Sequence, residues 1–472
     1  MNNVVVGMIG TGMDGRLMDN QYPKAFTERM KGQLGEELPA FLHALQEKPL
    51  RGIRFNPVRP CNTRMIPGIG DPIPWEPDGR YLSGDSDAGN RVLHEAGAYY
   101  IQEPSAMLPA RIMNAKPGER ILDLCAAPGG KTTQLASALH GEGLLVSNEP
   151  IPKRALILSR NIERLGVRNA LVISAYPDQI AAQWPGGFDG VQVDAPCSGE
   201  GMFRKHPETR NEWTPESAAG CAVRQAEILD AAARLVRDGG RIVYSTCTMN
   251  PDENEGIVSS FLRRHPEFET EPFELDGGIR APEGYFMMYP HRFRGEGQFA
   301  ALFRKIGDGE AKLPLNKSFT VPQKAEKEAV QRFDSGSPEI TGKLGNLLFA
   351  LPGCPETGHL KVFRAGIHLG ELRGKVFIPD HAWAIAGAFM DIPETKLDAD
   401  SAVRYITGET VNGDTNGWQR MTYCGWSLGW GKGSEGIIKN HYPKGLRKSL
   451  TSDAICDKIA DGINSSASPG NY

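Results

Sequence analysis

Between Glu119 and Lys305 the chain alternates short apolar runs with amphipathic helical patterns, and this alternation restricts the possible folds most strongly. The apolar runs predict five strands, at residues 121–124, 144–148, 170–173, 190–193 and 241–244. An amphipathic pattern before the last strand predicts a helix that Gly239-Gly240 ends. Strands that alternate with helices predict an α/β domain with a parallel sheet covered by helices on both faces.

Composition excludes several classes of protein. The chain has 472 residues, which predicts two to four domains, and its 40% hydrophobic and 23% charged content is typical of a globular protein. No apolar run approaches the roughly 20 residues that cross a bilayer, and the first residues lack a basic signal region. We therefore expect a cytoplasmic protein with no membrane partner.

The cysteine spacing and the net charge restrict the redox state, the metal content and the partner only weakly. Eight cysteines lie far apart and never form Cys-x-x-Cys, so we expect reduced thiols and no metal site. The net charge of −4 argues mildly against a nucleic-acid partner, but only the docking face of such a protein must be basic.

A loop of small residues follows the first predicted strand. It consists of Cys125, Ala126, Ala127, Pro128, Gly129, Gly130 and Lys131, and a helix is expected to begin at about Lys131. Small residues let a backbone approach a ligand closely, and in doubly wound sheets ligands bind at this edge. A phosphate-binding loop would need a glycine where Cys125 stands.

An acid, Glu149, follows the second predicted strand. A carboxylate at that position can accept hydrogen bonds from both hydroxyls of a ribose, as in dinucleotide-binding folds, although a surface glutamate is the alternative. Together with the small-residue loop, Glu149 favours a nucleoside cofactor. Because the loop lacks a phosphate cradle, we expect S-adenosylmethionine.

Two cysteines follow two further strands. Cys197 comes after the fourth strand in Asp194-Ala195-Pro196-Cys197, and Cys247 comes after the fifth, so both fall at the cofactor edge of the sheet. Either could be a buried structural cysteine. A thiol beside a methyl donor, however, suits methylation of pyrimidine carbon 5, because a thiolate that adds to carbon 6 makes carbon 5 nucleophilic. A base must then remove the carbon 5 proton, and Asp194 is suited to bond the N3 and amino edge of cytosine.

Three motifs carry a resemblance to a known family. Residues 123–133, 194–202 and 244–255 resemble the corresponding motifs of the Nop/Sun family of RNA 5-methylcytosine methyltransferases, and the likeness extends over about residues 22–306. It implies a Rossmann-like, seven-stranded methyltransferase domain that uses S-adenosylmethionine. It also implies that Cys247 is the attacking nucleophile, that Cys197 assists product release, and that Lys131 and Asp194 belong to the active site. DNA cytosine methyltransferases instead attack from a Pro-Cys motif, which here would mean Cys197.

The resemblance also implies a set of cofactor contacts. These are residues 125–131 and Glu149, with Arg154 and Asp194 as additions. At the third strand the family usually has an acid that contacts adenine, whereas this chain has Tyr176. Tyr176 could stack or hydrogen-bond there, or Asp178 could substitute.

The flanks of this domain predict RNA as the partner. Residues 51–57 and 97–105 resemble the N-terminal RNA-binding extension of the family, and residues 429–432 and 439–447 resemble the PUA-like module of the RsmF-type bacterial enzymes. Those enzymes modify 16S ribosomal RNA of the small subunit. The tail combines cations with aromatic residues that could stack on bases, namely Trp418, Trp426, Trp430, Lys432, Lys439, His441, Tyr442, Lys444, Arg447 and Lys448. A β-module with a tryptophan core is the alternative.

We therefore predict an S-adenosylmethionine-dependent RNA (cytosine-5-)-methyltransferase, monomeric and free of metal, that acts on rRNA. A tRNA enzyme, a non-catalytic ribosome assembly factor and a thiol redox protein are the alternatives. The predicted divisions are a flexible extension (1–21), an N-terminal α/β RNA-binding domain (22–103), the methyltransferase domain (104–306), a linker (307–338), an intermediate domain (339–397), a PUA-like β-rich domain (398–450) and a flexible tail (451–472).

Overall fold

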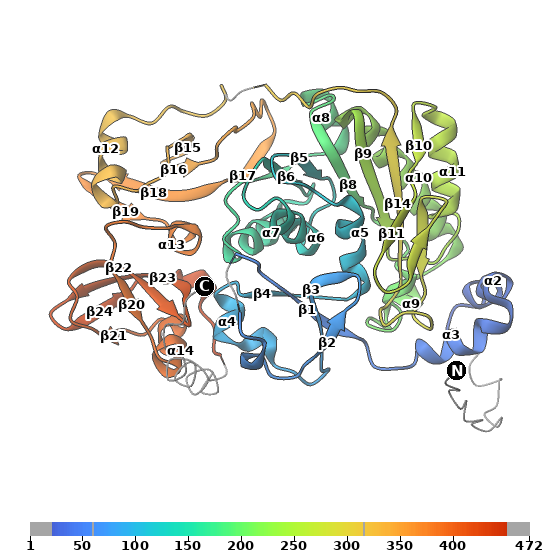
Figure 1. Cartoon of the computed structure of the whole chain (residues 1–472), viewed down its shortest axis with the longest axis horizontal. Helices are drawn as coiled ribbons and strands as arrows, with labels where there is room; N and C mark the ends of the chain where they lie inside the picture. Colours follow the sequence, from blue (N-terminus) through green and yellow to red (C-terminus); the bar gives the residue numbers. More distant parts are fainter. Residues whose placement is uncertain (1–20, 59–60, 315–316, 451–472) are drawn as a thin grey trace, which may run out of the picture.

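A computed structural model describes residues 21–58, 61–314 and 317–450. Nearly all of the predicted extension and the whole predicted tail lie outside these ranges. Figure 1 shows the central sheet in the middle and right of the molecule, a small N-terminal sheet below it, and the C-terminal modules on the left.

The central sheet has nine strands in the order β10-β14-β9-β8-β5-β6-β7-β17, with β13 also paired to β14. Its five inner strands, β9-β8-β5-β6-β7, are parallel. The bounds are β5 (Arg120–Asp123), β6 (Leu144–Asn148), β7 (Ala170–Ser174), β8 (Phe188–Asp194), β9 (Val236–Thr246), β10 (Phe268–Thr270), β13 (Tyr285–Met288), β14 (Gln298–Lys305) and β17 (Lys361–Ala365). All five predicted strands are present.

Helices cover both faces of this sheet. Along β5, Ile121 packs in one hydrophobic cluster with α5, α6 and α7, whereas Leu122 packs in another with α8, α10 and α11. This alternation is the pattern of a doubly wound fold, in which every strand is buried on two sides. The helices are α5 (Leu108–Met113), α6 (Gly130–Ala138), α7 (Pro152–Arg164), α8 (Pro177–Gln183), α9 (Thr209–Glu212), α10 (Pro215–Leu235) and α11 (Glu255–Arg264).

The predicted seven strands are present in the order β10-β14-β9-β8-β5-β6-β7. Two more strands join the sheet, because β13 pairs with β14 and because β17, from the C-terminal part of the chain, pairs antiparallel with β7. One detail of the predicted domain was wrong. Helix α10 ends at Leu235 and not at Gly239-Gly240. The glycines instead lie where the β8–β9 register shifts, and Gly239 has a φ of +72° that an L side chain rarely adopts.

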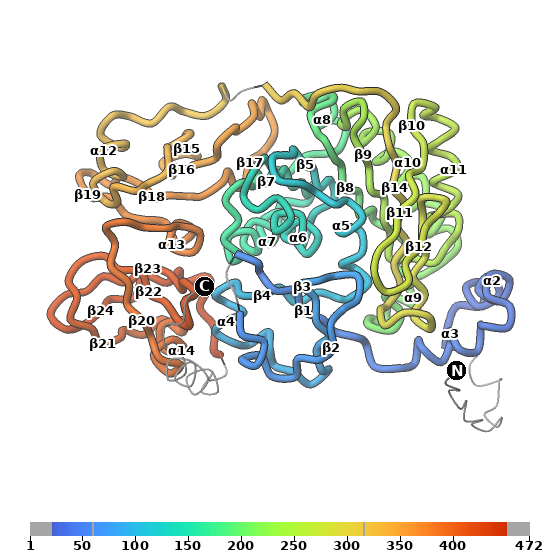
Figure 2. The backbone as a smooth tube through the Cα atoms, viewed as in Figure 1, coloured from blue at the N-terminus to red at the C-terminus, as the bar shows by residue number. Residues whose placement is uncertain are grey.

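The N-terminal part contains two helices and a four-stranded sheet. The two helices are α2 (Lys24–Leu34) and α3 (Leu38–Ala44). They pack against Phe203 and Trp213 of the central domain, and the chain then crosses to the small sheet (Figure 2). That sheet has the order β2-β3-β1-β4, with β1 (Arg51–Phe55), β2 (Ile69–Ile73), β3 (Glu76–Leu82), β4 (Tyr99–Gln102) and the short α4 (Val92–Glu95) beside it.

The predicted linker at 307–338 is not free of regular structure, because it contains α12 (Lys324–Phe333). Ala329 and Val330 of this helix are buried against the sheet β15-β16-β18-β19. The last sheet has the order β20-β22-β23-β24-β21. The remaining bounds are β11 (Phe273–Leu275), β12 (Ile279–Ala281), β15 (Gly342–Leu344), β16 (Leu347–Ala350), β18 (Ile367–Arg373), β19 (Val376–Pro379), α13 (His381–Ala386), β20 (Glu394–Lys396), α14 (Ala399–Thr407), β21 (Val411–Asn412), β22 (Gly417–Tyr423), β23 (Trp426–Ser434) and β24 (Ile437–Asn440).

A buried ion pair of the central domain, Arg204–Glu296, forms hydrogen bonds with the N-terminal part of the chain. Arg204 Nε lies 2.6 Å from Glu296 Oε2, and both side chains are at most 3% exposed. Arg204 Nη1 also donates to Ala44 O of α3, and Glu296 Oε1 accepts from Leu50 N. Removal of one partner would leave a buried charge without its counterion.

We predict that Arg204→Ala lowers the free energy of unfolding by about 3–5 kcal/mol, because breaking a buried pair strands the remaining charge. Urea unfolding followed by tryptophan fluorescence measures this. As a control, Arg280→Ala removes the exposed Arg280–Glu274 pair and should cost less than about 1 kcal/mol. Equal effects of the two substitutions would contradict the account.

Candidate active site

The parallel register brings the predicted site residues to one edge of the sheet. Asp123 pairs with Ser147 between β5 and β6, and Asp194 pairs with Ser245 between β8 and β9. The four strands therefore end at similar height, and the segments that follow them lie side by side. The prediction that both cysteines and the small-residue loop share this edge is confirmed.

The loop at residues 125–131 is held from below by hydrogen bonds. Thr132 Oγ1 donates to Asp123 Oδ2 at 2.6 Å, and Asn148 Nδ2 donates to Leu124 O at 3.1 Å. Burial raises the pKa of Asp123 to about 7. Gly129 has a φ of +115° at the N-terminal end of α6, which explains why a glycine is needed there.

Glu149 stands at the end of β6 and is 2% exposed. Its Oε1 accepts from Ile151 N at 2.9 Å, and its Oε2 lies 3.2 Å from Arg154 Nη1. Arg154 Nη2 also donates to Ala127 O at 3.0 Å, so Arg154 bridges the acid and the small-residue loop. The carboxylate, the loop and the lysine at its end form a donor set that fits the nucleoside and amino-acid parts of S-adenosylmethionine.

Tyr176 is the exposed residue at the end of β7, with 70% of its surface accessible. It immediately precedes α8, and its backbone N donates to Gln179 Oε1. Asp178, the predicted substitute for the missing acid, is instead paired with Arg234 of α10. Of the two candidates, the geometry therefore favours Tyr176 beside the cofactor edge.

The two thiols face each other across the ends of β8 and β9. Cys197 Sγ lies 3.2 Å from Cys247 Sγ, and both cysteines are free. The hydrogen bond to Cys247, followed by burial, raises the pKa of Cys197 well above its ordinary value. Cys197 therefore holds its proton at neutral pH, and one of the two thiols donates a hydrogen bond to the sulfur of the other.

Asp194 forms the third part of the site. Its Oδ2 accepts from Lys131 Nζ at 2.8 Å, and its Oδ1 accepts from Ser245 Oγ at 2.7 Å. Burial acts to lower the pKa of Lys131, but the charge of Asp194 and their hydrogen bond outweigh it, so the pKa is raised. Lys131 thus remains a cation, and it links the small-residue loop to the strand that carries Cys197.

Two functional candidates were missed from the sequence. Glu200 and Glu253 are both fully buried and lie next to the cysteine loops. Each lies inside one of the family motifs, at residues 194–202 and 244–255, and this position could have marked it as a candidate. Nothing in the sequence, however, indicated which groups it contacts.

The predicted stacking surface of the tail was wrong for three of its aromatic residues. Trp426, Trp430 and Tyr442 are at most 6% exposed and pack in the cores of the C-terminal modules, as a β-module with a tryptophan core requires. His441 is exposed, and Trp418 is partly exposed. Its ring lies 4.4 Å from that of His441, and Lys432 Nζ lies 5.4 Å from its centroid.

The described residues contain neither a candidate metal cluster nor a candidate membrane span. Among residues 21–58, 61–314 and 317–450, no group of three or more His, Cys, Asp or Glu side chains is arranged to hold a metal ion. In the same part of the chain, no helix is long and apolar enough to cross a bilayer.

Comparison with solved structures defines the class of the protein. A methyltransferase homolog from Pyrococcus horikoshii aligns with a TM-score of 0.54 and 26% identity over 62% of this chain and 100% of that one. NSun6 from the same organism, solved with SFG, shares the fold with a TM-score of 0.53 and 22% identity, over 61% of this chain and 100% of that one. Fold and edge geometry together define an S-adenosylmethionine-dependent methyltransferase.

Sequence comparison then defines the family. Family models match the 16S rRNA methyltransferase RsmB/F domain at residues 110–304, the RsmF N-terminal domain at 22–104, the first RsmF C-terminal domain at 327–386 and the RsmF PUA domain at 393–448. Ribosomal RNA small subunit methyltransferase F of Klebsiella pneumoniae is 31% identical over 90% of this chain and 96% of its own length. The Vibrio vulnificus relative of the same name is 30% identical over 90% and 97%. The chain belongs to the ribosomal RNA small subunit methyltransferase F family.

The thiol geometry predicts a distinctive reactivity. Cys197 should be alkylated slowly by iodoacetamide at pH 8, and its rate should rise only as the pH approaches its raised pKa. Cys247→Ala removes the largest cause of that shift, so the pKa should fall and alkylation at a given pH should accelerate. Peptide mass spectrometry measures this, with Cys354 as a control, because burial alone raises its pKa to about 12. An unchanged Cys197 rate in Cys247→Ala would contradict the contact.

Proposed function

We propose that the protein methylates carbon 5 of a cytosine in 16S ribosomal RNA of the small subunit. The observation that carries this proposal is the pair of thiols 3.2 Å apart beside the Lys131–Asp194 ion pair. Two thiols in contact at a cofactor edge suit a reaction in which one sulfur bonds to the base and the other assists its release. The choice of RNA is supported by the names of the relatives.

The reaction begins when Cys247 adds to the base. The sulfur of Cys247, as the thiolate, forms a bond to carbon 6, and carbon 5 becomes enamine-like and nucleophilic. Bound S-adenosylmethionine supplies an electrophilic methyl group. Cys197 Sγ lies 3.2 Å from the Cys247 sulfur, so its thiol is placed to donate a hydrogen bond to it. The thiolate, and not the thiol, is the nucleophile in such a step.

Release restores the aromatic ring. Once carbon 5 carries the methyl group, a base removes its proton, and the electron pair of that bond forms the carbon 5–carbon 6 double bond. The sulfur of Cys247 leaves with the electrons of its bond to carbon 6. We assign Cys197 to assist this release, because it is the titratable group in contact with Cys247.

Asp194 and Lys131 orient the base. The Asp194 carboxylate can accept a hydrogen bond from the amino group of cytosine, which uracil lacks, while Lys131 and Ser245 hold its two oxygens in place. Because Cys247 must approach carbon 6 from above the ring, the target cytosine has to be unpaired or flipped out of its stack.

Residues 125–131, Glu149, Arg154, Tyr176 and Asp194 would contact the cofactor. The predicted division into RNA-binding flanks around residues 104–306, the monomeric state and the cytoplasmic location stay predictions.

Methylation of three RNAs tests the function. Purified protein with labelled S-adenosylmethionine should place label in 5-methylcytidine of unmodified 30S subunits, and Cys247→Ala should abolish it because no thiolate can activate carbon 5. Nucleoside digestion and chromatography measure the product. Deproteinised 16S rRNA and tRNA are run in parallel. Label in tRNA but not in 30S subunits would replace the rRNA assignment, and activity that survives Cys247→Ala would overturn the nucleophile.

The cofactor assignment is tested without turnover. Glu149→Ala should weaken S-adenosylmethionine binding by about tenfold to a hundredfold, because hydrogen bonds to a charged group contribute about 1.5–3 kcal/mol. Isothermal titration calorimetry measures the affinity. The exposed Glu142, at the other end of β6, gives a matched control in Glu142→Ala, which should bind normally. Equal affinity of both variants would remove Glu149 from the cofactor site.

A further inference from the structure

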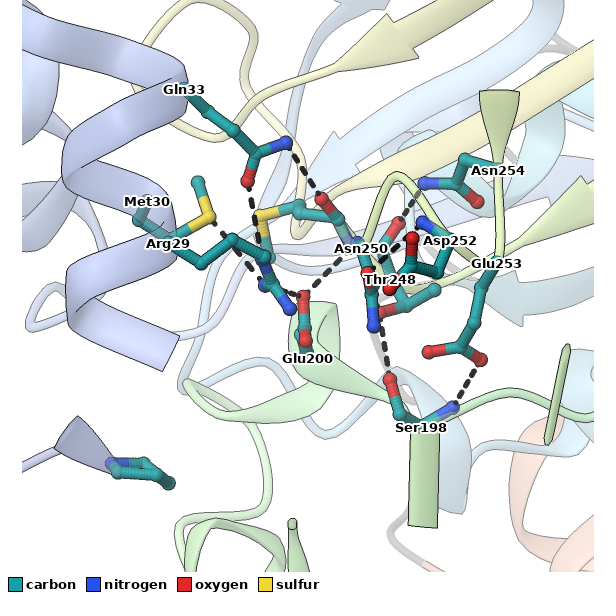
Figure 3. Close-up of polar contacts among 12 residues, drawn as sticks. Arg29, Met30, Gln33, Ser198, Glu200, Thr248, Asn250, Asp252, Glu253 and Asn254 are labelled. Carbon is teal, nitrogen blue, oxygen red and sulfur yellow. Dashed lines mark hydrogen bonds and ion pairs between the residues drawn. The ribbon is translucent and has the colours of Figure 1, made fainter. Parts of the chain in front are cut away.

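The two cysteine loops exchange hydrogen bonds through two buried carboxylates. Glu200 follows Cys197, and its Oε2 accepts from Met249 N of the other loop at 3.1 Å. Glu253 follows Cys247, and its Oε2 accepts from Ser198 N of the first loop at 2.9 Å (Figure 3). Each loop thus supplies a carboxylate that binds a backbone N–H of its neighbour. Both glutamates are fully buried.

Direct contacts between the loops reinforce this exchange. Gly201 N donates to Cys247 O at 2.8 Å, and the hydroxyls of Ser198 and Thr248 lie 2.9 Å apart. A Cβ atom at Gly201 would lie 2.7 Å from Cys247 O, so the approach requires glycine. The backbone next to each thiol is therefore held by the opposite loop.

Different groups contact the Oε2 atoms of the two carboxylates, whereas both Oε1 atoms are buried without a hydrogen-bond partner among the described residues. Arg29 Nη2 of α2 lies 2.6 Å from Glu200 Oε2, and Gln33 of the same helix donates to Met249 O at 3.3 Å (Figure 3). Glu253 forms no ion pair with any described residue and instead accepts from Gln225 Nε2 at 2.9 Å. Burying a carboxylate is costly unless it is paired or hydrogen-bonded, so these contacts have to offset a substantial desolvation penalty.

We propose that Glu200 and Glu253 are positioning residues that hold the loops of Cys197 and Cys247 in place relative to each other. Arg29 of helix α2 contributes by fixing the Glu200 carboxylate. Neither glutamate needs to transfer a proton or touch the substrate in this role. The expected effect on turnover rests on the proposed function, but the contacts between the loops can be tested without any substrate.

The effect of these contacts on turnover follows from the distance between the Cys247 sulfur and carbon 6 of the base. The sulfur of Cys247 has to reach carbon 6 while Cys197 stays in contact with it, and a misplacement of about 1 Å in a catalytic group can reduce a rate by about a hundredfold. Loss of one carboxylate would free the loop that it holds. The turnover number should fall, whereas cofactor affinity should not, because the cofactor loop lies on β5 and α6.

Isosteric substitutions separate positioning from proton transfer. Glu253→Gln and Glu200→Gln each keep an oxygen that can accept the backbone N–H, so kcat should stay within about fivefold of wild type. Glu253→Ala and Glu200→Ala lose that acceptor, and kcat should fall by about tenfold to a hundredfold. The Kd for S-adenosylmethionine should change less than about twofold in all four. If Gln and Ala variants lose activity equally, or if the Ala variants retain full activity, the proposal is overturned.

Arg29 is tested with a control from its own helix. Arg29→Gln should lower kcat by about tenfold, Arg29→Lys should restore most of it, and Lys31→Gln, an exposed substitution two residues away, should have no effect. If Glu253→Ala or Glu200→Ala does not fold, Gln33→Ala removes the bond to Met249 O at a mostly exposed residue and should lower kcat by about twofold to threefold. Equal losses in Arg29→Gln and Lys31→Gln would contradict the role of α2.

Hydrogen exchange gives a readout that does not depend on methylation. Mass spectrometry of peptides that contain the amides of Ser198 and Met249 should show slow exchange in the wild type. The Ser198 amide should exchange at least tenfold faster in Glu253→Ala, and the Met249 amide in Glu200→Ala. If the wild type methylates no RNA, the proposed function fails while this result still tests the loop contacts. Unchanged exchange in folded Ala variants would overturn the positioning role.

Discussion

The parallel pairing of β8 with β9 is the constraint on which the site depends. Its register places Asp194 opposite Ser245, so the chain leaves both strands at the same height and each following loop brings a cysteine to the same point. Two thiols 3.2 Å apart then result from strand geometry together with the buried carboxylates that cross between the loops. The cofactor loop after β5 and Glu149 after β6 lie at the same edge. The sheet therefore brings the cofactor residues and the nucleophile to one side of the domain.

Local pattern predicted this framework well. The five inner strands, the start of α6 and the shared edge of Cys197 and Cys247 follow from apolar periodicity and from small residues at strand ends, which are properties of short stretches of chain. The family motifs added roles that spacing alone did not assign. Relatives at about 30% identity over most of the chain support the same fold and class of enzyme.

Long-range pairing could not be predicted in this way. Strand β17 joins the sheet beside β7, and nothing in residues 361–365 indicates a partner so far along the chain. Arg29 and Glu200 are 171 positions apart, so their ion pair depends on how α2 packs against the methyltransferase domain. Trp430 was expected on an RNA-binding surface because aromatic residues serve both cores and stacking, and composition does not distinguish burial from exposure.

In the proposed reaction Cys247, and not Cys197, bonds to the base. Cys197→Ala should accumulate a covalent RNA–protein complex, because the first bond forms and release is impaired. Nuclease and protease digestion followed by tandem mass spectrometry would identify the linked residue. The account predicts a cytidine derivative on Cys247. A nucleotide on any other residue of Cys197→Ala, or a complex that forms in Cys247→Ala through Cys197, would contradict it.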